Sequence, residues 1–305
     1  MEPEEWVFRE GNGLRITQNM LSTQVIRNIQ TNYRSLSRYQ EQIASGKAIN
    51  KVSDDPVKSV QIMSYRSALT ETEQFKRNAE DGLNWLETTD RALDDLTQVM
   101  QKVRELTVQG SNGVNNKDSL ESIAKELKAL KGNLGDIANT RLGDRFLFAG
   151  TATDTAPFEN GEFTSTNSDP LSWNVGQGIY MKVNVNGTDI FKFQAGGLNL
   201  ADTVEKIAGE LEAGNDPEQY LDHLDKQMNN LLAHRSIVGS NVNQLEMMVN
   251  RLDQTVLSTK SMLSKTEDAD LAEIITNFTT QQTILNAALS SGARVIQQTL
   301  VDFLR

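Results

Sequence analysis

"LDKQMNNLLAHRSIVGSNVNQLEMMVNRLDQTVLSTKSML", Leu224 to Leu263, places an apolar side chain at every third or fourth position along one continuous segment. Arg235 and Thr259 fill its two polar gaps, and this spacing is typical of a helix that packs along a neighbouring helix. The apolar positions are Leu224, Met228, Leu231, Val238, Val242, Leu245, Val249, Leu252, Val256 and Leu263. Because a helix of about 40 residues is roughly 60 Å long, the segment predicts an extended rod and not a thick globular core.

Two shorter rows of apolar side chains with the same spacing, which we call seams, precede this segment. The first contains Leu86, Leu93, Leu96, Met100, Val103 and Leu106, and the second contains Leu120, Ile123, Leu127, Leu130, Leu134 and Ile137. "GSNGVNN", Gly110 to Asn116, separates them, and its glycines and asparagines are typical of a turn. We therefore expect two helices that form an antiparallel hairpin.

The pattern changes between residues 146 and 200. "RFLFAGT", Arg145 to Thr151, and "WNVGQGIYMKVNVNGTDIFKFQAGG", Trp173 to Gly197, show the alternation and the aromatic and β-branched content of strands. Asn186-Gly187 is expected to form a hairpin turn between two of these strands. The segment predicts a small β-rich domain inserted into the helical rod.

Both ends of the chain carry thin apolar seams that we interpret as assembly surfaces. The N-terminal seam contains Ile26, Ile29, Tyr33, Leu36 and Ile43; the C-terminal seam contains Leu271, Ile275, Phe278, Leu285, Leu289, Ile296, Leu300 and Phe303. Two interpretations remain open. The end helices either complete a four-helix bundle inside the monomer or become ordered when neighbouring subunits supply the missing face.

The predicted fold class is therefore mainly α with a β-rich insertion, in the form of an elongated antiparallel coiled-coil helical rod. The expected parts are an N-terminal assembly helix and turn over 14–55, the two halves of the rod over 56–145 and 201–263, the β-rich insertion over 146–200, and a C-terminal assembly helix over 264–305.

Short polar motifs predict where the terminal helices begin and end. Gly46 is expected to end the first helix. Ser53, Asp54 or Asp55 is expected to cap the next helix, and Pro56 is expected in its first turn. "EDAD", Glu267 to Asp270, is expected at the N-terminus of the last helix, where the helix dipole favours acidic groups.

Composition and motifs argue against several classes of function. The charge of −11 and the lack of a Lys and Arg cluster argue against nucleic acid as a partner, and no segment has the roughly 20 apolar residues that membrane insertion needs. The chain has no cysteine, and its two histidines, His223 and His234, lack the spacing of a metal site. We expect no metal, no cofactor and no enzymatic activity.

Both ends of the chain resemble the conserved regions of bacterial flagellins and their hook-associated relatives. Asn19 to Leu69 resembles the N-terminal region through its seam helix, "SGKAIN" at Ser45 to Asn50 and "DDP" at Asp54 to Pro56. Glu267 to Leu289 resembles the C-terminal region through "EDAD" and the amphipathic helix that follows. Within the family, "RFLFAGT" and the ending "LVDFLR", Leu300 to Arg305, resemble members from the hook-filament junction.

This resemblance implies a structural role outside the cell, in the bacterial flagellum. A junction member would form a ring of its own copies between hook-associated protein 1 and the first flagellin, next to the filament cap during assembly. It would pass unfolded through the flagellar type III export apparatus without a cleaved signal peptide, and an export chaperone would guard its C-terminal helix. Two alternatives remain: a minor flagellin that forms the filament itself, or a secreted coiled-coil effector or adhesin.

The first residues depart from the family pattern. Family members begin with Met immediately before "RIT", whereas Leu14 occupies that place here. We expect Leu14 to mark the natural start, through an alternative start codon, and Met1 to Gly13 to be additional upstream residues.

Overall fold

The computed structural model describes residues 18–113 and 116–303 of the chain, so the expectation about Met1 to Gly13 lies outside the described residues. Side chains in the terminal helices are described for Met20 and for residues 22–293. The chain divides into two compact units. The first is formed by residues up to 67 and from 259 onward, and the second is formed by residues 68–258.

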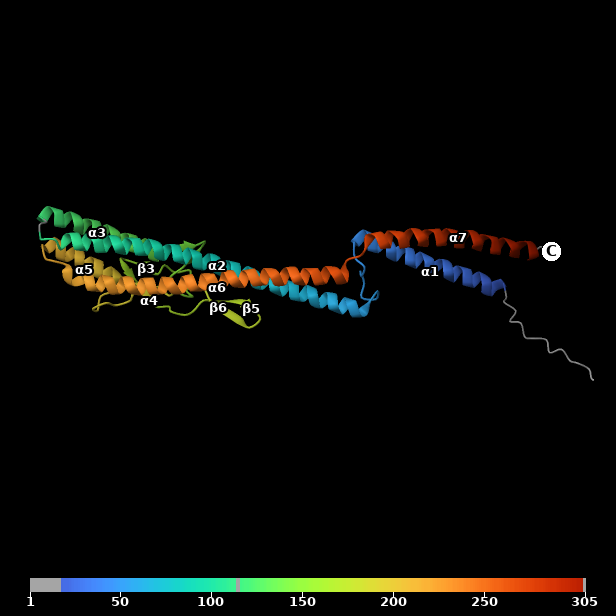
Figure 1. The fold of residues 1–305 in the computed structure, drawn as a ribbon, viewed down its shortest axis with the longest axis horizontal. Coiled ribbons are helices and arrows are strands. Elements are labelled where there is room, and N and C mark those ends of the chain that lie inside the picture. The colour runs from blue at the N-terminus through green and yellow to red at the C-terminus, as the bar shows by residue number, and fades with distance from the viewer. Residues whose placement is uncertain (1–17, 114–115, 304–305) are drawn as a thin grey trace, which may run out of the picture. The chain divides into compact units, whose positions relative to one another are not determined.

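The second unit is built on two long helices, α2 (Pro56–Gly110) and α6 (Leu221–Glu267), which also contribute residues to the first unit. They run antiparallel in the second unit, because ion pairs join Lys76 to Asp253 and, further along α2, Arg104 to Asp225. Helices α3 (Lys117–Ala138) and α5 (Leu200–Ala213) pack on each other and share the core of α2 and α6 (Figure 1). A short 3-10 helix, Glu218–Tyr220, leads into α6.

The predicted seams of α2, α3 and α6 lie in the core of this unit, which confirms their assignment. Because one fully buried Leu or Val contributes about 1.5–3 kcal/mol, this apolar seam is the main stabilising feature of the unit. Helix α5 belongs to the part predicted as the second half of the rod, but its seam was not recognised in the sequence. Completely buried side chains come from all four helices: Leu86, Leu93, Leu96, Met100, Val103, Leu127, Val204, Ile207, Leu231, Val238 and Leu245.

The segment predicted as a β-rich domain contains much less sheet than expected. It holds two short antiparallel pairs: β3 (Phe158–Glu159) with β4 (Glu162–Phe163), and β5 (Ser172–Gly176) with β6 (Ile179–Lys182). A third pair, β1 (Arg141–Leu142) with β2 (Arg145–Phe146), lies where the chain enters this segment. Most of the chain between these pairs is irregular.

Asparagine side chains replace the missing sheet hydrogen bonds. Asn139 accepts the N–H of Phe158 at 3.0 Å and donates to the carbonyl of the same residue at 2.9 Å. Asn184, which is 3% exposed, accepts the N–H of Leu171 and donates to the carbonyl of Asp169. Buried backbone groups need hydrogen-bond partners, so these amides allow the irregular loops to pack against the helices.

The prediction of a hairpin turn at Asn186-Gly187 was wrong. A short helix, α4 (Gly187–Phe191), begins there, and the Asn186 amide donates to the carbonyl of Ser168 at 2.9 Å. Gly187 is required for close packing, because a Cβ on it would lie 2.6 Å from the backbone oxygen of Phe148. The hairpin turn lies instead between β5 and β6, where Gly178 has a φ of +72°.

The first unit contains a helix pair, α1 (Gln18–Ser45) and α7 (Leu271–Phe303), shown side by side in Figure 1. The two helices are antiparallel: Asn32 accepts a hydrogen bond from Gln281 at 2.9 Å, while a Cβ on Gly292 would lie 2.9 Å from Cγ1 of Val25. Helix α7 begins at Leu271, and α6 extends beyond its predicted end at Leu263, through "SKTE" to Glu267.

Candidate assembly surfaces

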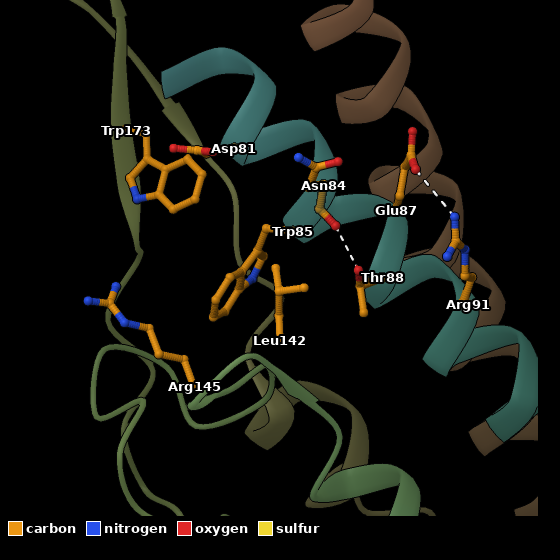
Figure 2. Close-up of a pocket in the computed structure, with 9 residues that line it drawn as sticks. All are labelled: Asp81, Asn84, Trp85, Glu87, Thr88, Arg91, Leu142, Arg145 and Trp173. Carbon is orange, nitrogen blue, oxygen red and sulfur yellow. Dashed lines mark hydrogen bonds and ion pairs between the residues drawn. The ribbon is translucent and has the colours of Figure 1, made fainter. Parts of the chain in front are cut away.

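A groove on the second unit has the concave shape of a possible chemical site (Figure 2). Its volume is about 490 Å³, and Trp85 of α2 and Trp173 of β5 line it with their rings edge to face, centroids 6.4 Å apart. Its lining residues include no histidine or cysteine, and the hydroxyl of Thr88 donates to the backbone carbonyl of Asn84 at 2.8 Å. The Thr88 hydroxyl is therefore engaged with the backbone of its own helix, and Glu87 pairs with Arg91 at 3.4 Å.

The described residues contain no group of three or more His, Cys, Asp or Glu side chains that is arranged to hold a metal ion. His223 packs on Tyr220 with ring centroids 5.9 Å apart, and its ring occupies the space where a Cβ on Gly196 would lie. His234 is a half-buried side chain on α6. Neither ring takes part in a cluster of potential ligands.

The predicted terminal seams divide into two sets in the structure. Leu285 is buried between α1 and α7, and Ile29, Leu36, Ile43 and Phe278 are half-buried. The other set is exposed: Ile26 (50%), Tyr33 (52%), Leu271 (47%), Ile275 (49%) and Leu289 (41%). The remaining predicted positions, Ile296, Leu300 and Phe303, belong to the part of α7 whose side chains lie outside the described residues.

Other residues of this helix pair were missed in the sequence. Met20 and Ile284 are large apolar side chains that are 62% and 46% exposed. Gly292 permits the close approach of Val25, a role that apolar spacing does not reveal. We define the assembly face as the exposed apolar side chains of α1 and α7: Met20, Ile26, Tyr33, Leu271, Ile275, Ile284 and Leu289.

On the assembly face, exposed apolar side chains follow both helices of the pair. Contiguous exposed apolar patches mark interaction surfaces in proteins. The pairing of α1 with α7 covers one side of each seam and leaves the other side exposed.

The predicted cap residues lie in the turn between α1 and α2. Gly46 follows the last residue of α1 with a φ of +70°, and its N–H donates to the carbonyl of Gln42 at 2.9 Å. Asp55 caps α2, since its carboxylate accepts the N–H of Lys58 at 3.0 Å, and Pro56 is the first residue of that helix. Asp54 instead accepts the N–H of Lys51 at 3.0 Å and so closes the turn itself.

The "EDAD" motif divides between two roles that the sequence did not distinguish. Asp270 caps α7 by accepting the N–H groups of Ala272 and Glu273, as expected for an acid at a helix N-terminus. Glu267 is the last residue of α6, so its assignment to the start of the final helix was wrong. Its carboxylate is 5% exposed and pairs with Lys47 at 2.5 Å and with Arg66.

The electrostatic surroundings of Glu267 favour its ionised form. Burial raises the pKa of Glu267, but hydrogen bonds from Lys47 and Arg66 and the charges of both groups lower it by more, so the pKa lies below its usual value of 4.5. A buried carboxylate with two cations joins segments that are distant in the sequence.

Long helices, small two-stranded sheets and exposed apolar side chains along both terminal helices are typical of a structural protein. The chain belongs to the flagellin family: residues 16–153 match the bacterial flagellin N-terminal helical region, and residues 221–304 match the C-terminal helical region. It is therefore a structural component of the bacterial flagellum. Among the described residues, no helix combines the length and the apolar content needed to span a lipid bilayer.

Relatives with nearly the same length include both filament and hook-associated proteins. Flagellin of Bacillus subtilis (strain 168) is 26% identical over 93% of this chain and 97% of its own length. Flagellar hook-associated protein 3 of Escherichia coli (strain K12) is 26% identical over 90% of this chain and 95% of its own length.

The fold is shared with solved hook-associated proteins. The hook-associated protein 3 structure from Legionella pneumophila has a TM-score of 0.60 and 16% identity, and the match covers 67% of this chain and 98% of that chain. Bacillus cereus FlgL has a TM-score of 0.56 and 19% identity, with coverage of 66% and 99%.

Proposed function

We propose that this protein forms the junction layer between hook-associated protein 1 and the flagellin filament, and that it permits filament assembly at that place. The near full-length similarity to hook-associated protein 3 of Escherichia coli carries this proposal. The shared fold with the Legionella pneumophila hook-associated protein 3 supports it. On this proposal the protein acts as an adaptor and has no enzymatic activity.

Copies of the chain form the proposed junction layer through the assembly face. Side chains such as Ile26, Tyr33 and Ile275 are about half exposed in the single chain, so their burial between subunits would gain roughly 25 cal/mol per Å² of apolar surface. Hook-associated protein 1 on one side and flagellin with its filament cap on the other are the proposed neighbours.

The proposed location requires export. The chain would pass unfolded through the type III flagellar apparatus, and an export chaperone would cover α7, whose exposed Leu271, Ile275 and Leu289 would otherwise promote association inside the cell. The mature protein is then extracellular and remains part of the flagellum.

Deletion of the gene tests the junction role. We expect hooks without filaments by electron microscopy, loss of motility, and flagellin released into the medium; a copy of the gene that begins at Leu14 should restore filaments. Normal filaments on motile cells after the deletion would refute the junction role.

A minor flagellin is the second candidate, favoured by the similarity to Bacillus subtilis flagellin over 97% of that protein's length. Purified protein that polymerises alone into extended filaments under salting-out conditions would support this candidate. A protein that stays as short assemblies under conditions that polymerise flagellin would support the junction role.

A further inference from the structure

Two chain turns of the first unit are joined by backbone hydrogen bonds. The α1–α2 turn begins at Gly46, and the α6–α7 turn begins after Glu267. The N–H of Ala48 donates to the carbonyl of Glu267 at 2.8 Å, and the N–H of Ala269 donates to the carbonyl of Gly46 at 3.0 Å. These two bonds form an antiparallel bridge between Lys47 and Asp268.

Ion pairs of the Glu267 carboxylate add to the backbone hydrogen bonds of this bridge. Lys47 approaches it from the α1–α2 turn and Arg66 approaches it from α2, while the neighbouring Asp268 is occupied by a hydrogen bond from Ser264 at 2.5 Å. Glu267 is thus the acidic group on which two cations from separate segments converge. The carboxylate is 5% exposed, whereas the side chains of Lys47 and Arg66 are 41% and 52% exposed. Loss of the carboxylate charge removes both ion pairs at once and leaves a buried neutral group between two cations.

The joined turns lie where the pairing of α1 and α7 begins. Helix α1 ends at Ser45 and α7 starts at Leu271, so the bridge fixes which residue of α1 faces which residue of α7. The register matters because Val25 needs the free space at Gly292, where a Cβ would lie 2.9 Å from its methyl carbon. A shift along the helix would place a larger side chain in that contact.

We propose that Glu267 is a positioning residue for assembly: it holds the α1–α2 turn on the α6–α7 turn and thereby sets the register of the α1–α7 pair. This register decides which apolar side chains remain on the assembly face. Only this last step rests on the proposed junction role, since the register itself is a property of the single chain.

An engineered disulfide reports the register directly, because the natural sequence contains no cysteine. With Val25→Cys and Gly292→Cys in the full-length purified protein, we expect rapid formation of an intramolecular disulfide under mild oxidation. Adding Glu267→Gln should lower the rate by at least about tenfold. The matched control is Glu273→Gln, which neutralises an exposed carboxylate in the first turn of α7 and should leave the rate unchanged.

A charge-based role can be separated from simple loss of packing. In the Glu267→Gln background, Lys47→Met together with Arg66→Met should restore part of the disulfide rate, since it removes the two cations that have lost their acidic partner. Leu285→Ala removes a buried side chain of α7 and no charge. In a Leu285→Ala background, Lys47→Met with Arg66→Met should therefore not restore the disulfide rate.

Equal disulfide rates in the parent double-cysteine protein and in its Glu267→Gln derivative would overturn the proposal. A parent protein that forms no disulfide would also overturn it, because α1 and α7 would not pair in this register. Filament assembly in the deletion strain is measured separately, so failure of the junction role would leave the disulfide result intact.

Discussion

Gly187 shows at the scale of a single residue how a missing Cβ determines the path of the chain. A side chain there would collide with the backbone oxygen of Phe148 at 2.6 Å and with the Phe163 ring. We expect Gly187→Ala to lower the free energy of unfolding by about 1–3 kcal/mol, measured by urea denaturation. Gly209→Ala on α5 is the control: no atom lies within 4 Å of the new Cβ, so the change should be neutral or stabilising.

Glu267 gives a residue-scale prediction about pH. Its pKa lies below 4.5 in the folded chain, because the hydrogen bonds and charges of Lys47 and Arg66 outweigh the effect of burial. The stability that its charge contributes is therefore present above about pH 4.5 and is lost as the pH falls through the lowered pKa.

The pH prediction is tested by thermal unfolding of the natural protein and of Glu267→Gln between pH 7 and pH 3. The difference in Tm between them should be constant at neutral pH and should shrink in acid. Other carboxylates titrate in both proteins and cancel in the comparison. A difference that stays constant down to pH 3 would contradict the ion-pair account.

At the scale of elements, substitutions on the exposed side of the terminal helices should impair assembly, and substitutions on their buried side should lower stability. Ile26→Ser with Ile275→Ser changes two side chains that are about half exposed, so the free energy of unfolding should change by less than about 1 kcal/mol while incorporation into flagella is lost. Cells that carry this variant are examined for filaments by electron microscopy.

The control for the element-scale experiment is Leu285→Ala, on the buried side of α7. It should lower the free energy of unfolding by about 2–5 kcal/mol and weaken the packing of α1 on α7. Hydrogen exchange should then be faster in both helices. Filaments of normal length with the double Ser variant would show that the assembly face has another role.

The helices were predictable from the sequence because their apolar spacing repeats over many turns. Seam residues such as Leu93 and Leu245 are buried as the spacing predicts. The β-rich region was not predictable in detail, since its order depends on asparagines such as Asn139 and Asn184 that bond to residues distant in the sequence. The pairing of Glu267 with Arg66 spans 201 residues, a relation that no local pattern reveals.

At the scale of the whole molecule, the second unit has its own continuous core within one uninterrupted stretch, residues 68–258. We expect a polypeptide of these residues to fold cooperatively by itself, with a Tm within a few degrees of the corresponding transition of the full chain. Circular dichroism measures both transitions.

Leu93→Ala serves as the control for the whole-molecule prediction, because Leu93 is completely buried in that core. It should lower the Tm of the isolated unit and of the full chain by a similar amount. An isolated unit without a cooperative transition would mean that residues outside 68–258 are needed for its fold.

The asparagine-held loops of the second unit have a consequence for the environment in which the protein works. Amide side chains carry no charge at any ordinary pH, and their hydrogen bonds are little affected by dissolved ions. The surface ion pairs between α2 and α6, such as Arg104 with Asp225, are weakened by salt. In fresh water, brine or mild acid, the loops around Asn184 and Asn186 should therefore keep their shape even where the charged contacts of the helices have weakened.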